Sequence, residues 1–197
     1  LPPSRLPALP PPAPRSALEA AKSLVLVETA GAGAVDAVQQ YRGAVDSGGG
    51  ALCIAVYRGK LSEGISFNDD YARMVLCVGL PFPSIGDEKL RSKRAFNDHP
   101  TARAAGLLPG QAWFRQQAFR ALNQALGRCI RHRDDWGAVF LVDERFAGET
   151  ERDGLAAWVR SMLPPQPPAR FAEVAADAAA HFRAAPRAVR ERRARAA

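Results

Sequence analysis

The sequence has few of the residues that usually build metal and redox sites. It contains three cysteines and three histidines in 197 residues, and no two cysteines stand in a C-x-x-C pair. Cys53 and Cys77 lie within apolar runs, where a free thiol behaves as a small hydrophobic group. The sequence therefore predicts a reducing compartment and no metal site in this chain.

Long apolar runs and phosphate-binding loops are also missing. No run approaches the roughly 20 apolar residues that span a bilayer, so we expect no membrane partner. Residues 58–60 read Arg-Gly-Lys, but Leu61 follows and the P-loop pattern fails. Gly31 and Gly33 begin a G-x-G pattern whose third glycine position is Asp36, which disfavours a dinucleotide-binding loop.

Positive charge is abundant and unevenly placed. The net charge is +7. Residues 86–133 carry ten Lys/Arg against three Asp/Glu, and residues 183–197 carry six Arg against Glu191 alone. Such concentration favours a polyanionic partner, nucleic acid first. For the C-terminal segment, a solvated Arg/Ala helix is an equal alternative.

Strand-like and helix-like segments alternate along the chain. The patterns predict strands at 23–28, 51–57, 73–80 and 137–142, and helices at 35–45, 87–97, 111–132, 155–162 and 169–183. This alternation predicts an α/β fold with a parallel sheet and helices on both faces. We expect a Pro-rich leader over residues 1–16, one domain over 17–183 and a basic tail over 184–197.

The long predicted helix also contains aromatic residues. Trp113, Phe114 and Phe119 could stack on nucleobases. Aromatic residues at such spacing on a long helix are more often part of the core, and we expect that here.

Residues 120–133 contain the pattern Q-x-x-G-R-x-x-R. Gln124, Arg128 and Arg131 fall at the helical spacings i, i+4 and i+7, so we expect them to share one face. Two guanidinium groups on one face favour an anion between them, and a triphosphate suits them because arginine is always charged and presents a fixed fork of donors. Gly127 lets backbone or ligand approach closely. The alternative is a solvated basic face.

A second motif, RGKLSEGISF, occupies residues 58–67 after the apolar run 51–57. Gly59 and Gly64 flank the polar residues Lys60 and Ser62, so the backbone is accessible where polar groups gather. By itself this segment could be an ordinary polar loop between a strand and a helix.

Together, RGKLSEGISF and QALGRCIRHRDDWGAVFLVDERF resemble motifs V and VI of the XPD/FANCJ-type iron–sulfur DNA helicases of superfamily 2. The segment NDDYARMVLCVGLPFPSIGD between them extends the resemblance, which runs from about Leu24 to about Phe182 and is closest to the FANCJ branch. It implies a RecA-like second motor domain without a P-loop of its own. One position departs: the family usually has Asp, sometimes Asn, where this chain has Ser66.

The resemblance implies roles for individual residues. Arg128 and Arg131 would be catalytic arginine fingers. Gln124, Gly64 and Ser66 would face the nucleotide, and the Gly64–Ser66 turn would link the nucleotide to DNA. Lys60 and Ser62 would contact the phosphates of DNA.

The resemblance also implies cofactors and partners. ATP with Mg²⁺ would be shared with a first motor domain that this chain lacks, and the 4Fe–4S cluster would belong to that missing part. The DNA would be single-stranded or forked, and the enzyme a nuclear helicase acting in DNA repair. The chain alone would be inactive. The alternative, which Ser66 favours, is a non-catalytic nucleic-acid-binding remnant of a helicase.

Overall fold

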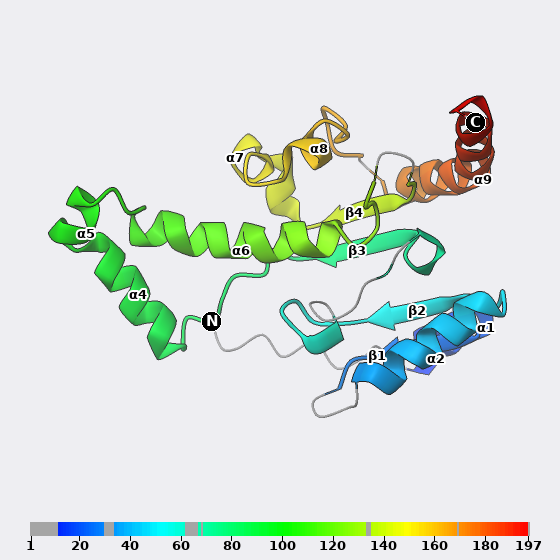
Figure 1. Cartoon of the computed structure of the whole chain (residues 1–197), viewed down its shortest axis with the longest axis horizontal. Coiled ribbons are helices and arrows are strands. Elements are labelled where there is room, and N and C mark those ends of the chain that lie inside the picture. Colours follow the sequence, from blue (N-terminus) through cyan, green and yellow to red (C-terminus); the bar gives the residue numbers. More distant parts are fainter. Residues whose placement is uncertain are drawn as a thin grey trace. The chain divides into compact units, whose positions relative to one another are not determined.

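The computed structural model describes residues 12–29, 34–61, 67, 69–132, 135–168 and 170–196 (Figure 1). This part of the chain contains both helices and strands. Their bounds are α1 (Pro12–Ala21), β1 (Leu24–Val27), α2 (Ala34–Asp46), β2 (Ala51–Ile54), η1 (Asp69–Tyr71), β3 (Met74–Val78), α4 (Glu88–Asp98), α5 (Pro100–Ala104), α6 (Gly110–Leu126), β4 (Ala138–Val142), η2 (Glu144–Ala147), α7 (Glu149–Arg152), α8 (Ala157–Arg160) and α9 (Phe171–Ala196). None of the helices described has the length and apolar character that crossing a bilayer requires.

The chain divides into two compact units. The first unit comprises Leu1–Ile65 and Pro83–Trp113, and the second comprises Ser66–Phe82 and Phe114–Ala197. Each unit contains one pair of parallel strands. The predicted α/β class with parallel strands is therefore confirmed.

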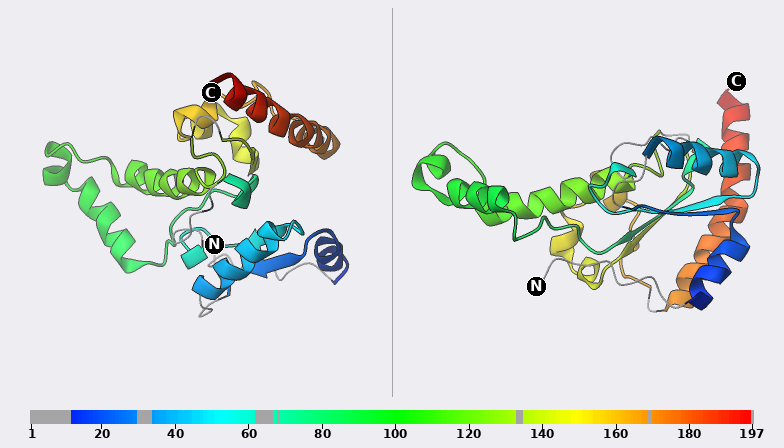
Figure 2. Two further views of the ribbon diagram at one scale, coloured as in Figure 1. Left: turned by 45° about the vertical axis from the view of Figure 1, so that its right-hand side comes forward. Right: turned by 90° about the horizontal axis from the view of Figure 1, so that it is seen from below.

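In the first unit, β1 and β2 pair in parallel, with Leu24 beside Ala51 and Val27 beside Ile54. α1 and α2 lie on opposite faces of this pair (Figures 1 and 2). Both strands are uninterrupted apolar runs, LVLV and ALCI, as expected for strands covered on two sides.

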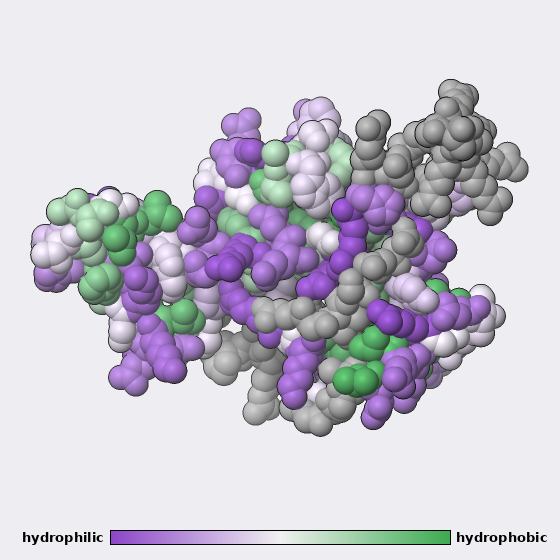
Figure 3. Space-filling model, in the orientation of Figure 1, coloured by the Kyte–Doolittle hydropathy of each residue, from purple (hydrophilic) through white to green (hydrophobic). Residues whose placement is uncertain are grey.

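The first unit also carries a helical arm made of α4, α5 and the start of α6. Asp87 caps α4 by accepting the N–H groups of Lys89 and Leu90. Asp98 links the end of α4 to the start of α6, because its Oδ1 accepts the Gly110 N–H at 2.7 Å. In Figure 3 hydrophilic residues dominate the visible side of α4 and α6, which agrees with the basic character of this part of the sequence.

In the second unit, β3 and β4 pair in parallel, from Met74 beside Ala138 to Val78 beside Val142. α6 contributes a buried stripe at helical spacing. Its members are Phe114, Ala118, Phe119, Ala121, Leu122 and Leu126, each at most 7% exposed. The expectation that Phe114 and Phe119 belong to the core is confirmed, and Trp113 is half-buried.

Two helices reach into the segments expected to be the leader and the tail. α1 begins at Pro12, inside the region expected to be a leader, because proline is tolerated in the first turn of a helix. α9 continues to Ala196, since its alanine- and arginine-rich sequence consists of good helix formers. It contains Pro186 in its interior.

Candidate functional site

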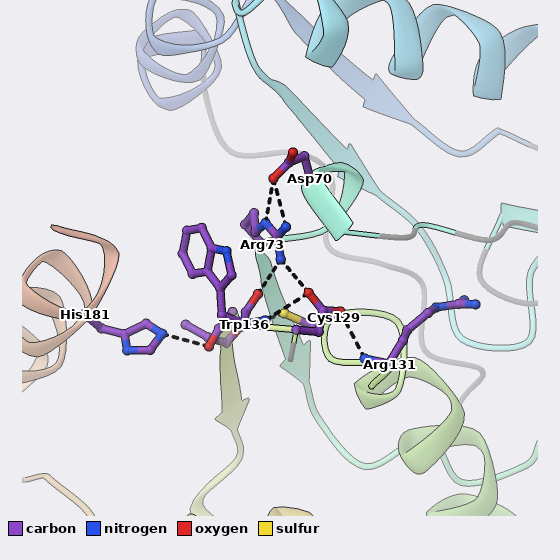
Figure 4. Close-up of polar contacts among 9 residues, drawn as sticks. Asp70, Arg73, Cys129, Arg131, Trp136 and His181 are labelled. Atoms are coloured by element: carbon purple, nitrogen blue, oxygen red, sulfur yellow. Dashed lines mark hydrogen bonds and ion pairs between the residues drawn. The ribbon is translucent and has the colours of Figure 1, made fainter. Parts of the chain in front are cut away.

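Strand pairing brings together two polar side chains that precede β3 and β4. The register places Met74 beside Ala138, and the Ala138 N–H donates to the carbonyl of Arg73 at 2.9 Å. The Arg73 guanidinium then donates to Asp135 Oδ1 at 2.6 Å and to the Trp136 carbonyl at 2.7 Å (Figure 4). Its central carbon also lies 4.6 Å from the Trp136 ring centroid, a cation–π distance.

Asp135 is deeply buried, with a side chain 1% exposed. Its Oδ1 also accepts the Trp136 N–H at 2.9 Å, and its Oδ2 accepts the Arg131 N–H at 3.1 Å. Burial by itself would raise the pKa of this carboxyl group. The hydrogen bonds from Arg73 and from the two backbone N–H groups outweigh burial and lower the pKa below its ordinary value. Asp135 is therefore an anion at neutral pH, and its charge is compensated.

Arg131 is anchored to this cluster through its backbone N–H. Its side chain is exposed and extends away from Arg73 (Figure 4). Arg128 is half-buried, and Gln124 is exposed in the last turn of α6. Gln124 and Arg131 are thus on the surface, and Arg128, which lies between them in the sequence, is half-buried.

The prediction that Gln124, Arg128 and Arg131 share one helical face is wrong. α6 ends at Leu126, and residues 127–129 form a turn with two i→i+3 backbone hydrogen bonds. Such bonds tighten a helix end, and Gly127 lowers the helix propensity at this point. Both arginines lie beyond the helix, where the course of the backbone is set by tertiary contacts.

Cys129 fixes the turn after α6 against the start of β4. Its Sγ lies 3.6 Å from the Ala138 carbonyl, and a Cβ at Gly137 would overlap Sγ and lie 2.9 Å from the Arg73 carbonyl. Burial raises the pKa of Cys129 to about 11, so the thiol is neutral at pH 7. Cys129 and Gly137 therefore form a close packing contact.

Glu28 holds the turn that carries Lys60. It follows β1, and its two carboxylate oxygens accept the N–H groups of Val56 and Leu61, each at 3.0 Å. Leu61 is 4% exposed and anchors the turn, whereas Lys60 is exposed. Gly59 is needed here because an added Cβ would overlap the Glu28 carboxylate.

Three predicted residues, Ser62, Gly64 and Ser66, fall outside the residues that the structure describes. Their roles remain predictions. Within the part of the chain that is described, no group of three or more His, Cys, Asp or Glu side chains is placed to hold a metal ion.

A second carboxylate stands at the opposite ends of the same strands. Asp143 follows β4, and its Oδ2 accepts the Leu80 N–H after β3 at 3.1 Å. Arg145 donates to Asp143 Oδ1 at 2.8 Å. This bond, the largest of several effects, lowers the pKa of Asp143 below its ordinary value. The Asp143 cluster resembles the Asp135 cluster in its chemistry, and its hydrogen bonds join Asp143 to Leu80 and Arg145.

Comparison with known families identifies the chain. Residues 14–162 match the profile described as "Helicase C-terminal domain". The chain belongs to this family. The parallel strands of both units agree with the α/β class predicted for this domain.

Several individual proteins resemble this helicase C-terminal domain. It is 55% identical over 117 residues to the Fanconi anemia group J protein homolog of Gallus gallus, covering 58% of this chain and 9% of that protein. It is 45% identical over 141 residues to the human regulator of telomere elongation helicase 1, covering 70% of this chain and 11% of that protein. The chain thus spans about a tenth of the length of these curated relatives.

A solved structure named XPD_Helicase also matches the helicase C-terminal domain. It has 26% sequence identity and a TM-score of 0.49, and the match covers 66% of this chain and 22% of that one.

The sequence patterns did not single out Arg73, Asp135 or Glu28. A signal for two of them was present. Arg73 is the first residue of one predicted strand and Asp135 stands just before another, and the starts of adjacent parallel strands lie at the same edge of a sheet. Aligning the strand starts would have placed this pair together.

Proposed function

We propose that this chain is the second motor domain of an ATP-dependent DNA helicase that acts in DNA repair in the nucleus. ATP and its Mg²⁺ would be bound by a separate first motor domain. One observation carries the proposal: Arg131 is anchored through its backbone and displays its guanidinium on the surface, in the segment that also carries Arg128 and Gln124.

The types of donor group in residues 124–131 fit a triphosphate. Two guanidinium groups and one side-chain amide can donate to phosphate oxygens. Asp135, which accepts the Arg131 N–H, has its charge compensated by Arg73. Guanidinium groups at the transferring phosphoryl group stabilise the charge that develops in the transition state. In this role Arg128 and Arg131 would act as arginine fingers, and Gln124 would contact the nucleotide.

DNA would be held by phosphate contacts. Lys60 is exposed on a turn whose backbone Glu28 holds in place, so its ammonium can reach a phosphate without reorganising the chain. Contacts of this kind position a strand without reading its sequence. Ser62 and the Gly64–Ser66 turn would extend this surface, and the preferred DNA would be single-stranded or forked.

The test joins this chain to a helicase first motor domain that carries G-x-x-x-x-G-K-[ST]. We expect Arg131→Ala to lower kcat on the order of 10³-fold or more, the range typical of arginine fingers. The affinity for single-stranded DNA should remain close to that of the parent. Arg131→Lys should restore little activity, because an ammonium lacks the planar fork. The measurements are steady-state ATPase with and without single-stranded DNA, and a DNA-binding titration.

The same experiment separates the proposal from its rival. Ser66, where the family usually has Asp, favours a non-catalytic nucleic-acid-binding remnant. If Arg131→Ala keeps the parental kcat but loses affinity for DNA, the arginine segment is a nucleic-acid surface. The remnant interpretation then replaces the motor-domain one.

A further inference from the structure

The Asp135 carboxylate joins the loop of Arg131 to the start of the β3–β4 sheet. Its Oδ2 accepts the Arg131 N–H, and its Oδ1 accepts from Arg73 and from the Trp136 N–H. We infer that Asp135, held by Arg73, is a positioning residue that fixes the backbone of Arg131 for catalysis. The catalytic part of this inference rests on the function proposed above.

The geometry requires a carboxylate at this position. Both oxygens of Asp135 accept hydrogen bonds on two different sides, and a carboxylate is the side chain of this size whose two ends are both acceptors. In an Asp135→Asn variant, the amide oxygen would turn toward the two donors, Arg73 and the Trp136 N–H. The amide NH₂ would then face the Arg131 N–H. The substitution therefore removes the Arg131 contact and keeps the others.

Arg73 makes two ion pairs of unequal importance. Its pair with Asp70 at 2.8 Å involves a carboxylate that is 84% exposed, and exposed pairs contribute little. Its pair with Asp135 at 2.6 Å involves a carboxylate that is 1% exposed. Without Arg73 the Asp135 charge would be buried without its cationic partner, which is strongly unfavourable. Arg73 is therefore what allows a charged Asp135 to reach the Arg131 loop.

The first test measures the Arg131 backbone directly in the 197-residue chain. We expect Asp135→Asn to accelerate hydrogen exchange of the Arg131 amide by about tenfold or more, as the loss of a charge-assisted hydrogen bond implies. The matched control is Asp143→Asn, which alters the corresponding cluster at the other ends of the strands and should leave Arg131 exchange unchanged. Arg73→Lys is a second variant, which should accelerate exchange less than Asp135→Asn. Parental protection of the Arg131 amide in a folded Asp135→Asn chain overturns the inference.

The second test asks whether positioning affects catalysis, in the protein joined to a first motor domain. Asp135→Asn should lower kcat by up to about 10²-fold, the cost of a small misplacement of a catalytic group, while the KM for ATP stays near the parental value. Added to Arg131→Ala, it should lower kcat little further, because residues acting as a unit are not additive. The effects of Asp143→Asn and Arg131→Ala on kcat should instead be independent, so that their fold-changes multiply.

The two tests fail in different ways. If Asp135→Asn frees the Arg131 amide but Arg131→Ala leaves kcat unchanged, the positioning contact stands and the proposed catalytic role of Arg131 is wrong. If Asp135→Asn and Arg131→Ala lower kcat independently, Asp135 acts through the general structure of the domain, and the positioning inference is overturned.

Discussion

At the scale of single residues, Asp135 is a buried carboxylate whose hydrogen bonds compensate the free energy of its burial. Removing a carboxylate from water is unfavourable unless it is paired and hydrogen-bonded. Here Arg73 and two backbone N–H groups supply the compensation. Breaking such a pair by removing one partner typically costs about 3–5 kcal/mol. The cluster is therefore sensitive to changes at either Arg73 or Asp135.

This compensation makes stability depend on pH in a defined direction. Because the pKa of Asp135 is lower in the folded state than its ordinary value, its ionised form stabilises the fold above the unfolded pKa of about 3.9. That contribution is lost as the pH falls through the folded-state pKa. We expect the difference in unfolding free energy between the parent and Asp135→Asn to be full at pH 7 and to shrink below about pH 4.

Urea unfolding at pH 7, 5, 4 and 3, followed by circular dichroism and tryptophan fluorescence, measures this difference. The pKa of Asp143 is also lowered in the folded state, so Asp143 contributes a pH dependence of the same sign. The Asp143→Asn chain removes that contribution and retains the one from Asp135. A gap between parent and Asp135→Asn that stays constant down to pH 3 would show that the Asp135 charge does not stabilise the fold.

At the scale of elements, the end of α6 decides where the arginines lie. The buried stripe of α6 runs down to Leu126, and buried Cys129 continues the core after the turn. The start of β4 packs against Cys129, where Gly137 leaves room for the sulfur. The helix end and the strand start are therefore fixed against each other.

Asn123 connects α6 to the segment before α8 and tests this view of the helix. Its side chain donates to the Gly154 carbonyl at 3.2 Å and accepts the Ala156 N–H at 2.9 Å. Asn123→Ala leaves both backbone groups without this partner, and we expect a loss of about 1–3 kcal/mol in unfolding free energy. Gln116→Ala, at an exposed position of the same helix, should change stability by less than about 0.5 kcal/mol. Equal effects of the two variants in urea unfolding would contradict the bridging role of Asn123.

At the scale of the whole molecule, positive charge and the lack of a P-loop pattern act together. The net charge of +7 favours polyanions irrespective of sequence. No G-x-x-x-x-G-K-[ST] pattern occurs in the 197 residues, so the chain has no loop of that kind to hold the β- and γ-phosphates of ATP.

We therefore expect the 197-residue chain alone to hydrolyse no ATP above background and to bind single-stranded DNA weakly. The affinity should fall steeply with salt, since it rests on the release of counterions from phosphates. Lys60→Ala should weaken binding to all sequences alike and reduce the slope of log K against log salt by about one. Lys60→Arg, which keeps the charge, should retain the slope. DNA-stimulated ATP turnover by this chain alone, or an affinity insensitive to salt, would contradict the assignment.

The sequence by itself determined the α/β class, the parallel strands and the family. Apolar runs, turn residues and helical spacing are local properties, so β1, α2, α4 and β4 lie close to their predicted positions. The motif residues Lys60, Gln124 and Arg131 were also found from local patterns, and the structure places all three on the surface.

Only the tertiary structure decided how Arg131 is held. Helical spacing predicted a shared face, but α6 ends at Leu126. No local sequence pattern encodes the hydrogen bond from the Arg131 N–H to Asp135. The 62-residue separation of Arg73 and Asp135 is closed by strand register, and Glu28 reaches Leu61 across 33 residues in the same way. Such contacts depend on which strands become neighbours, which is settled when the whole chain buries its apolar surface.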